Sequence, residues 1–461
     1  MLYAALSTGV RAGVNLILLP ILVKQLTTSE LALWWVFVSL GGLAGLADFG
    51  FGQAITRVYS YLWAGVQDFE VEGLHPPPSG AKPNQPRLRR FNATVCRLYL
   101  WLSLGSLVVL TLGGTVFLWG SAQTAPAPGT FWVIWGLYVM TVVYGFGSSH
   151  WTLACQGLDR VRDLQLAYLW SSLAYFFAAA AMLLAGCGLW AMVVASAVRG
   201  VLTRQICVSA YRRFVPKVKG EHTRADLVML RKIWPNAWKF GLLSVAVYLI
   251  NNGAVLVCSR YLGDEVTASY GLTSQLGLFL VSFSALWLTV KWPQITILRT
   301  QGRVREMAIL FARRLALVMI TFAAGAVLLL LLGNRLLEWK GSHTRLLALP
   351  YLVVYLLYLW QQLFYGQFGS LTFTENVVPF YRLAFCTGLG MITLSLLLTP
   401  QYGLWGLILA PVIAAQVGNS WYPIWLGFRG QPLSVREFLH AAIWGRVGPD
   451  HERRNQAGSA V

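Results

Sequence analysis

Three arginines lie within long apolar stretches of this sequence: Arg11, Arg199 and Arg204. A charged side chain near the centre of a bilayer costs at least ~2.5–3.5 kcal/mol, so it usually faces a cavity or a partner. At 1.5 Å per residue, Arg11 lies ~13 Å and Arg199 ~15 Å from the end of its stretch, whereas Arg204 is within ~8 Å and can reach the surface. Two deep guanidinium groups predict a cavity for an anion, with a structural ion pair or the capping of carbonyl groups as the alternative.

Other charged and polar residues accompany these arginines. Asn15 follows Arg11 by four residues, so both belong to one helical stripe. Lys239 and Arg57 lie at the ends of apolar stretches and are candidates to assist the same anion, although both also fit as ordinary charges of flanking loops. Asp48 is the acidic residue placed well inside an apolar stretch. We expect it to pair with Arg11, and the alternative is that it binds a coupling cation, H+ or Na+.

One apolar segment carries a series of tyrosines and a glutamine on a single helical face. Alternating spacings of four and three residues define this face: Tyr351, Tyr355, Tyr358, Gln362 and Tyr365. Aromatic rings and amide groups together suit the binding of a sugar, so Tyr355, Tyr358 and Gln362 are candidate glycan-facing residues. Tyr248 and Asn251 offer the same chemistry on another segment. Packing between helices is the alternative role.

No pattern of an enzyme or of a metal site occurs in the sequence. It contains no P-loop, HExxH or GxSxG motif. The six cysteines have no CxxC spacing and do not cluster with histidines or carboxylates at metal-ligand spacing. We therefore expect no catalytic residues, no metal and no organic cofactor.

The segments that position the polar residues are those of an all-α integral membrane protein. Hydrophobic residues make up 57% of the chain and charged residues only 11%. A membrane-spanning helix needs ~20 mostly apolar residues. This criterion predicts twelve spans, at 3–25, 31–55, 95–119, 131–154, 166–186, 189–209, 236–259, 266–291, 315–333, 347–372, 380–399 and 402–426. The short gaps between the fifth and sixth spans, and between the last two, predict tight helical hairpins.

Basic residues are strongly biased toward one side of this topology. Of the 36 Lys and Arg residues, 28 fall on the connections of one side and five on those of the other. The positive-inside rule therefore predicts that both termini are cytoplasmic. The same bias accounts for most of the net charge of +19, which is thus no evidence for nucleic-acid binding.

The twelve spans are expected to form two six-helix lobes. A weak repeat supports this division, since Lys24-x-Leu26 recurs as Arg260-x-Leu262 at the corresponding place in the second half. Repeats of the same sense imply a site between two lobes. The predicted parts are an N-terminal lobe at 1–210, a basic cytoplasmic linker at 211–235, a C-terminal lobe at 236–430 and a cytoplasmic tail at 431–461.

Two short helices on the inner membrane surface and one spacer are predicted outside the spans. In the linker, Thr223 and Asp226 have capping spacing and precede an apolar face that ends at Pro235. In the tail, the capping box is Ser434 with Glu437 and the hydrophobic staple is Leu433 with Phe438. The Pro-rich connection 64–92 is expected to be an extended spacer, with partner binding as the alternative.

Several short stretches, most of them at the opening of the chain, form a familiar pattern: Arg11, Lys24-Gln25-Leu26, Thr28-Ser29-Glu30, Leu33-Trp34-Trp35-Val36-Phe37, Asp48-Phe49-Gly50-Phe51-Gly52 and, in the second half, Arg260-Tyr261-Leu262-Gly263. With these residues the chain resembles the O-antigen and polysaccharide flippases of the multidrug/oligosaccharidyl-lipid/polysaccharide exporter superfamily. The Pro-rich insertion at 64–92 departs from the family pattern.

This resemblance implies a V-shaped, MATE-like pair of lobes in the bacterial inner membrane. Such proteins move undecaprenyl-diphosphate-linked oligosaccharide from the inner to the outer leaflet by alternating access. Arg11 and Arg199 would oppose the diphosphate, the tyrosine face would hold the glycan, and membrane lipids would surround the polyprenyl tail. A glycan polymerase and chain-length machinery are the protein partners that the resemblance suggests.

Two other transporters of similar architecture are alternatives. A cation-coupled multidrug exporter needs buried acidic residues, and Asp48 is the candidate here, so the sequence disfavours it. A lipid II flippase resembles a design with fourteen spans, whereas twelve are predicted for this chain.

Overall fold

The computed structural model describes residues 13–14, 17–65, 83–123, 125, 127–216, 226–339, 341–342, 344–373, 380–430 and 433–444. Within these ranges the side chains of Gln53, residues 227–236, Lys239 and Thr300 are not described. All regular secondary structure in the described ranges is helical, as the sequence predicts.

The chain forms two compact units. Unit 1 comprises Met1–Ala268 with Lys340–Thr344, and unit 2 comprises Ser269–Trp339 with Arg345–Val461. The predicted division into lobes begins the second half at residue 236, whereas the first unit extends to Ala268 because the helix after the linker packs against the first helices of the chain.

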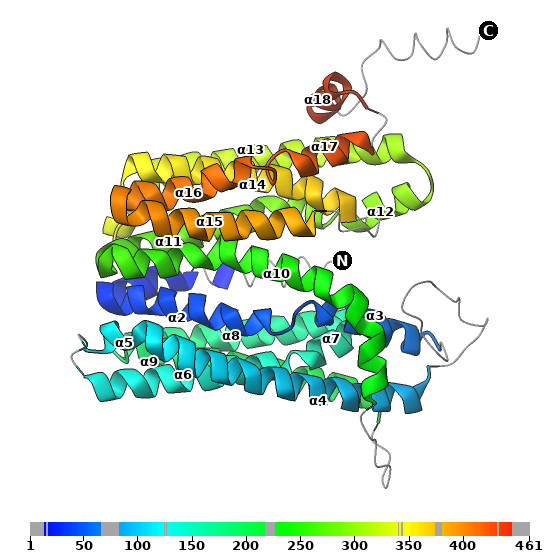
Figure 1. Ribbon diagram of the computed structural model, residues 1–461, viewed down its shortest axis with the longest axis horizontal. Helices are drawn as coiled ribbons and strands as arrows, with labels where there is room; N and C mark the ends of the chain where they lie inside the picture. Colours follow the sequence, from blue (N-terminus) through cyan, green and yellow to red (C-terminus); the bar gives the residue numbers. More distant parts are fainter. Residues whose placement is uncertain are drawn as a thin grey trace. The chain divides into compact units, whose positions relative to one another are not determined.

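Unit 1 is built from long helices that pack side by side (Figure 1). Residues 17–25 are helical and precede them. The named helices are α2 (Thr28–Leu46), α3 (Phe51–Trp63), α4 (Gln85–Val109), α5 (Thr115–Gln123), α6 (Pro128–Ser148), α7 (His150–Gly157), α8 (Val161–Leu184), α9 (Leu189–Phe214) and α10 (Leu227–Tyr261). A π-helical segment, Leu110–Gly114, joins α4 to α5. The predicted hairpin of α8 and α9 is confirmed by their packing along each other.

A break divides the second predicted span, which the sequence suggests as one helix over 31–55. Helix α2 ends at Leu46 and α3 begins at Phe51, with a turn at residues 47–50 between them. Gly50 has φ +78° and Phe49 has φ +41°, both in the left-handed region that ends a helix. At Gly50 a Cβ atom would lie 2.3 Å from the carbonyl oxygen of Ala237 on α10, so only glycine fits this approach.

The fourth and twelfth predicted spans are broken as well. Ser149 separates α6 from α7. In unit 2, residues 417–421 separate α16 (Leu404–Gln416) from α17 (Tyr422–Arg429). The predictions of single helices over 131–154 and 402–426 are therefore wrong in this detail, because apolar composition does not reveal where a helix turns.

The short helix predicted to end at Pro235 is part of a longer one. Helix α10 begins at Leu227 and continues through Pro235 to Tyr261. Its ribbon bends sharply near its start (Figure 1), and proline within a helix removes one backbone hydrogen bond and favours such a bend. The prediction was wrong because a proline can kink a helix instead of ending it.

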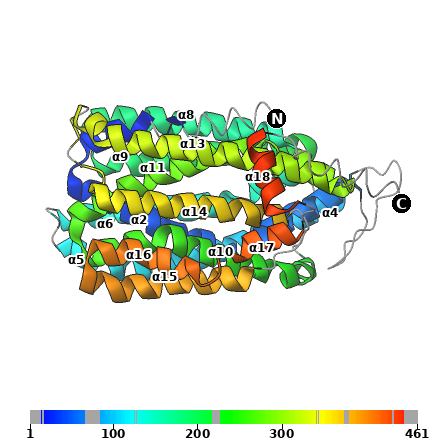
Figure 2. The ribbon, with the colours of Figure 1, turned by 90° about the horizontal axis from the view of Figure 1, so that it is seen from above.

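Unit 2 contains the remaining helices, and the long ones among them also run side by side in Figures 1 and 2. They are α11 (Gly263–Thr289), whose first residues belong to unit 1, α12 (Trp292–Thr300), α13 (Val304–Trp339), α14 (Leu349–Phe373), α15 (Tyr381–Tyr402), α16, α17 and α18 (Val435–Trp444). The second predicted hairpin is confirmed, since α15 and α16 pack along each other. The predicted capping box of the tail is present, because the Ser434 Oγ and the Glu437 carboxylate form hydrogen bonds at the start of α18.

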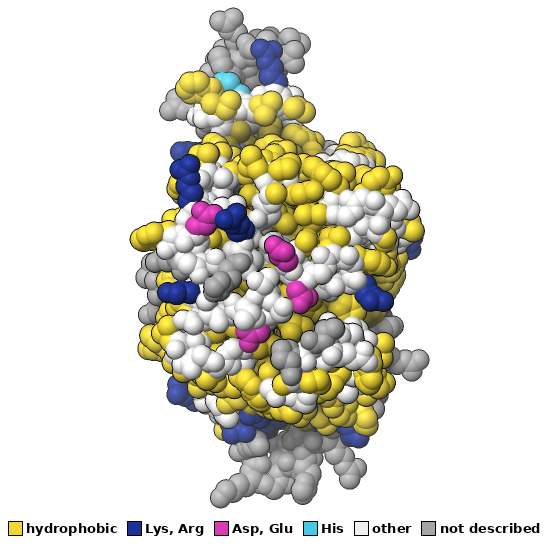
Figure 3. All heavy atoms as spheres, turned by 90° about the vertical axis from the view of Figure 1, so that its left-hand side faces the viewer, with side chains coloured by type: hydrophobic (Ala, Val, Ile, Leu, Met, Phe, Trp, Pro, Cys, Tyr) yellow, Lys and Arg dark blue, Asp and Glu magenta, His cyan; other side chains and the backbone are white. Residues whose placement is uncertain are grey.

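The surface of these helices is that of a membrane protein. Among the described residues, nine helices are long and apolar enough to cross a membrane. Helix α14 is not one of the nine although it has 25 residues, because its tyrosines and glutamines make it less apolar. Figure 3, which looks onto the ends of the long helices, shows hydrophobic atoms among polar and charged ones. Large hydrophobic side chains such as Leu112, Val116 and Ile320 are exposed. A surface of large exposed apolar side chains is soluble in lipid rather than in water.

Candidate functional site

Arg199 projects from the middle of α9 and is exposed. Each residue turns an α-helix by about 100°, so Arg199 lies about 140° around the helix from Val194. Val194, Val201 and Gln205 fall within about 20° of one direction and are exposed as well. Arg199 therefore does not share the face on which the exposed valines of α9 lie.

Aromatic rings of unit 1 hold the guanidinium of Arg199. Its Cζ atom lies 4.8 Å from the ring centre of Tyr175 on α8, within the range of a cation–π interaction. Tyr138 on α6 lies near both Arg199 and Tyr175. Both tyrosines are buried, so the arginine lies at the edge of a packed aromatic wall with its own side chain accessible.

The wall continues from Tyr138 to α2. The Tyr138 ring centre lies 5.9 Å from that of Trp34 and 5.3 Å from that of Phe37. A Cβ atom at position 41 would lie 2.4 Å from the hydroxyl oxygen of Tyr138, so the glycine at this position leaves space for the hydroxyl. This packing joins α2, α6, α8 and α9 around the one predicted deep arginine whose position is described.

Arg204 points to a different side of α9. It is half-buried, and its Cζ atom lies 5.9 Å from the ring centre of Tyr144 on α6. Because five residues separate Arg199 from Arg204, their side chains diverge by about 140°. The two arginines therefore do not form one cationic cluster.

Asp48 lies in the turn between α2 and α3, and both of its carboxylate oxygens accept a hydrogen bond. The Tyr99 hydroxyl on α4 donates to Oδ1. The Gly52 backbone N–H donates to Oδ2 at 3.0 Å, which satisfies one of the free N–H groups at the start of α3. The predicted pair with Arg11 lies outside the described residues. Tyr99 is a partner that sequence reasoning missed, since 51 positions separate it from Asp48.

A buried histidine adjoins this contact at the second helix break. The ring centres of His150 and Tyr99 are 5.8 Å apart, and His150 Nδ1 lies 2.7 Å from the Gly147 carbonyl oxygen. His150 is 4% exposed, and its Nε2 has no hydrogen-bond partner among the described residues. The turn that holds Asp48 and the break that holds His150 thus meet at one tyrosine.

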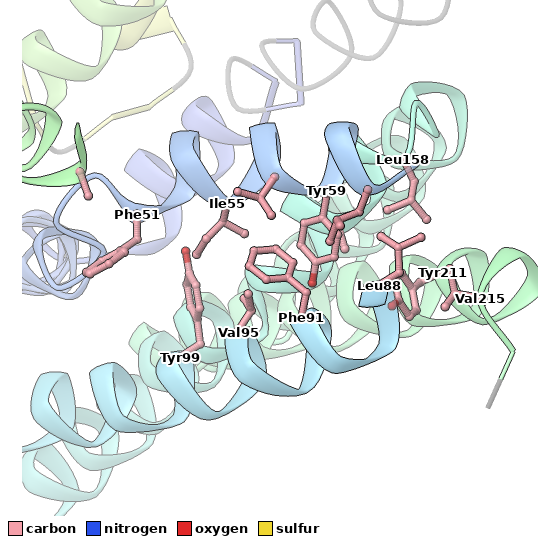
Figure 4. Close-up of a cluster of buried hydrophobic side chains, with 14 residues drawn as sticks. Phe51, Ile55, Tyr59, Leu88, Phe91, Val95, Tyr99, Leu158, Tyr211 and Val215 are labelled. Carbon is pink, nitrogen blue, oxygen red and sulfur yellow. The ribbon is translucent and has the colours of Figure 1, made fainter. Parts of the chain in front are cut away.

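An apolar cluster fixes this meeting point. Figure 4 shows Tyr99 beside Phe51, Ile55 and Val95, with Tyr59 and Phe91 further along the same interface. The Tyr59 hydroxyl donates to Asn92 Oδ1 at 2.8 Å. Tyr99 is 1% exposed, and rigid packing around it limits its movement, so its contact with the half-buried Asp48 has a defined geometry.

Of the other basic candidates, Arg57 has a described side chain. Arg57 on α3 is exposed. The side chain of Lys239 and the whole of Arg11 and Asn15 lie outside the description, so their roles remain predictions. In the part of the chain that the structure describes, no three His, Cys, Asp or Glu residues group as a metal site.

In unit 2 the predicted glycan-facing tyrosines are buried within the unit. The Tyr355 ring centre lies 5.9 Å from that of Tyr270 on α11, and the Tyr358 hydroxyl lies 3.9 Å from Met391 Sδ on α15. Gln362 is half-buried. These contacts are of the kind that joins helices, the alternative that the sequence left open, and a contact with glycan stays a prediction.

Tyr248 and Asn251 belong to unit 1, on α10. The Tyr248 hydroxyl donates to the Ser39 carbonyl oxygen of α2 at 2.9 Å, and its ring packs where Gly42 leaves space. Asn251 is half-buried. Tyr248 thus ties α10 to α2, and the glycan role of both residues also stays a prediction.

No family model and no curated protein matches the chain. Solved structures match it at low identity over nearly its whole length. The lipid II flippase MurJ in an inward closed conformation matches with a TM-score of 0.65 and 12% identity, covering 96% of this chain and 89% of that one. The MATE multidrug transporter DinF-BH matches with a TM-score of 0.65 and 12% identity, covering 95% of each chain. An inward-facing multidrug resistance MATE family transporter of the MOP superfamily matches with a TM-score of 0.61 and 13% identity, covering 91% of this chain and 95% of that one.

These matches define the fold of the protein. The chain shares the fold of the MATE transporters and of MurJ, and its long apolar helices are those of a multi-pass membrane protein. The matched structures are of transporters and a flippase, and at this identity the likeness extends to the fold and not to a substrate.

Proposed function

We propose that the protein is a flippase that moves undecaprenyl-diphosphate-linked oligosaccharide, a repeat unit of O-antigen or another surface polysaccharide, from the inner to the outer leaflet of the bacterial inner membrane. Twelve spans in two lobes would carry out this movement by alternating access. The observation that supports the proposal most is Arg199, an accessible guanidinium halfway along α9 and away from its exposed valines. A diphosphate is the anion that such a group suits best.

The chemistry of Arg199 explains why an anionic cargo is favoured. In a medium of low dielectric constant, a cation without an ionic partner is costly, and binding of a phosphate would compensate that cost. Tyr175 stabilises the guanidinium by a cation–π contact and leaves its N–H groups available to phosphate oxygens. Arg11, Asn15, Lys239 and Arg57 are the further proposed contacts for the diphosphate.

The multidrug exporter remains the second candidate, and Asp48 is the observation that favours it. Its carboxylate is held by the Tyr99 hydroxyl and the Gly52 N–H, and a carboxylate so placed could bind a coupling ion, H+ or Na+. A cationic drug, however, would be repelled by Arg199, so we propose that any ion bound at Asp48 drives the movement of an anionic lipid.

Removal of the protein distinguishes these functions. In a bacterium that lacks it, we expect lipid-linked repeat units to accumulate on the inner leaflet and the surface polysaccharide to be lost. Lipid-linked glycan can be located by its accessibility to a periplasmic glycosidase. Unchanged surface glycan together with increased sensitivity to cationic dyes would instead support the drug exporter.

A further inference from the structure

The last described helix, α18, carries more apolar surface than the described part of the chain covers. Its capped start is well defined, because the Ser434 N–H and hydroxyl both donate to the Glu437 carboxylate at 2.8 Å. The helix then runs for ten residues, from Val435 to Trp444. It is a short, stably initiated element, in which the direction of each side chain is fixed.

One face of α18 docks on unit 2 through a phenylalanine. The ring of Phe438 is buried among three others, with centres 6.2 Å from Phe311 of α13, 6.0 Å from Phe368 of α14 and 5.1 Å from Phe428 of α17. Ala441, one turn further along, is fully buried. This aromatic cluster accounts for the attachment of α18 to the bundle.

A second apolar face remains uncovered by the described part of the chain. It consists of Val435, Leu439 and Ile443, which follow one another at four-residue spacing and are 59%, 58% and 74% exposed. We call these three residues the outer stripe. At about 100° per residue, the outer stripe spans an arc of about 80° and is separated from Phe438 by about 60°. The docked and exposed apolar faces are therefore continuous around the helix.

The remaining arc carries the polar residues Arg436, Glu437 and His440 and, on the side away from the outer stripe, the exposed Trp444. Arg436 and His440 lie about 20° and 60° beyond the edge of the outer stripe, and Arg436 is exposed. A helix with a wide apolar arc and a basic flank is typical of helices that lie in the interface of a membrane. Trp425 on the preceding helix is half exposed, and its ring centre lies 5.2 Å from the Cζ atom of Arg429. An aromatic ring beside a basic residue is common in the interface of a membrane.

The axis of α18 is oriented as that of a helix lying in a membrane interface. Figures 1 and 2 both show it lying across α13, whereas α13 and its neighbours in unit 2 run along one another. Because the long helices cross the membrane, an element that lies across them runs along the membrane plane. Phe311, which it contacts, is in the first part of α13, so α18 lies near one end of the span and not at the bilayer centre.

We propose that α18 is an interfacial helix that binds the phospholipid surface, with the outer stripe among the acyl chains and Arg436 at the headgroup phosphates. The side concerned is the one where α13 begins, the cytoplasmic side in the predicted topology. Anchored to lipid on one face and to Phe311, Phe368 and Phe428 on the other, α18 fixes the depth at which the ends of three helices lie in the bilayer.

Two single-cysteine variants of the full chain test this proposal. Cys96, Cys187 and Cys386, the cysteines that are exposed or half-buried, are first replaced by serine. An environment-sensitive fluorophore is then attached to Ile443→Cys on the outer stripe or, as the matched control, to Arg436→Cys on the basic flank. Each protein is reconstituted into vesicles of phosphatidylethanolamine and phosphatidylglycerol, and quenching by acyl-chain nitroxide lipid and by aqueous iodide is measured.

We expect the fluorophore at position 443 to be quenched severalfold more by the nitroxide lipid than by iodide, and the one at position 436 to show the reverse order. Equal, strong quenching of both by iodide would mean that α18 stands away from the membrane and would overturn the proposal. Protection of position 443 from both quenchers would also overturn it, because the outer stripe would then be covered by protein, such as a second copy of the chain.

Discussion

The hydroxyl of Tyr99 donates a hydrogen bond to the carboxylate of Asp48, and this bond joins α4 to the turn that divides α2 from α3. The carboxylate is thereby held at the start of a helix, where the Gly52 N–H also donates to it. Both carboxylate oxygens of Asp48 are thus held by donors, one on α4 and one on α3.

Replacement of Tyr99 by phenylalanine should destabilise unit 1. The ring still fills its place in the apolar cluster, but the carboxylate loses a donor, which costs about 1.5–3 kcal/mol for a hydrogen bond to a charged group. The free energy of unfolding in detergent, measured by denaturant titration, should fall by that amount. Tyr144→Phe is the control, because the ring of Tyr144 is exposed and its contact with Arg204 needs no hydroxyl. Equal stability of the two variants would show that the bond contributes nothing.

Glycine is required at position 50 and not at position 45. Gly50→Ala places a Cβ atom 2.3 Å from the Ala237 carbonyl oxygen at φ +78°, so we expect a loss of about 1–3 kcal/mol from backbone strain alone. Gly45→Ala, in the adjoining helix with no atom near its Cβ position, should stabilise the protein by about 0.5–1 kcal/mol. Thermal unfolding of the purified variants measures both changes, and a stable Gly50→Ala protein would contradict the observed turn.

The ring of Tyr175 should matter to transport more than its hydroxyl. Tyr175→Phe keeps the aromatic face beneath Arg199 and should retain most export of glycan. Tyr175→Leu removes the cation–π contact, worth about 0.5–2 kcal/mol, and leaves the guanidinium without a fixed position. Surface polysaccharide on complemented cells, normalised to protein in the membrane, measures the difference. Identical export by the two variants would mean that the contact does not orient Arg199 for its cargo.

If an ion is coupled to transport, Asp48 is where we expect it to act. Asp48→Asn keeps the acceptor for Tyr99 but cannot ionise, so export should lose its dependence on a proton or sodium gradient. Uptake of labelled polyprenyl-diphosphate disaccharide into the lumen-facing leaflet of vesicles, with and without an imposed gradient, measures this. A gradient response as large as that of the unmodified protein would exclude Asp48 from coupling.

Sequence reasoning predicted those features that depend on local composition. The apolar runs indicate the long helices, the short gap after Leu184 indicates the α8–α9 hairpin, and the Ser434–Glu437 spacing indicates the start of α18. Glycine and polar residues do lie at the breaks at residues 47–50 and at Ser149, but similar residues also occur within unbroken helices, so composition does not place the breaks. They depend on packing against distant elements, as the approach of Gly50 to Ala237 illustrates.

The candidate site was only partly predictable for a similar reason. The cost of a charge within an apolar stretch singles out Arg199 and Asp48 from sequence alone. Their partners Tyr175 and Tyr99 lie on other helices. The sequence alone gives no reason to prefer these two over the other tyrosines of the chain, because the packing of the helices decides which ones come close. The tyrosine face of α14 shows the converse, because a regular spacing selects a face but does not say whether another helix covers it.

The export of lipid-linked glycan by Arg199 variants tests the central claim most directly. The variants Arg199→Ala and Arg199→Lys are compared with Arg212→Ala, which removes an exposed arginine from the last turn of the same helix. Surface polysaccharide and the protein level in the membrane are measured for each. We predict that the alanine variant at position 199 accumulates in the membrane but exports no glycan, that lysine restores part of the export, and that Arg212→Ala is unaffected. Normal export by Arg199→Ala would contradict the proposal that this guanidinium binds the diphosphate of the cargo.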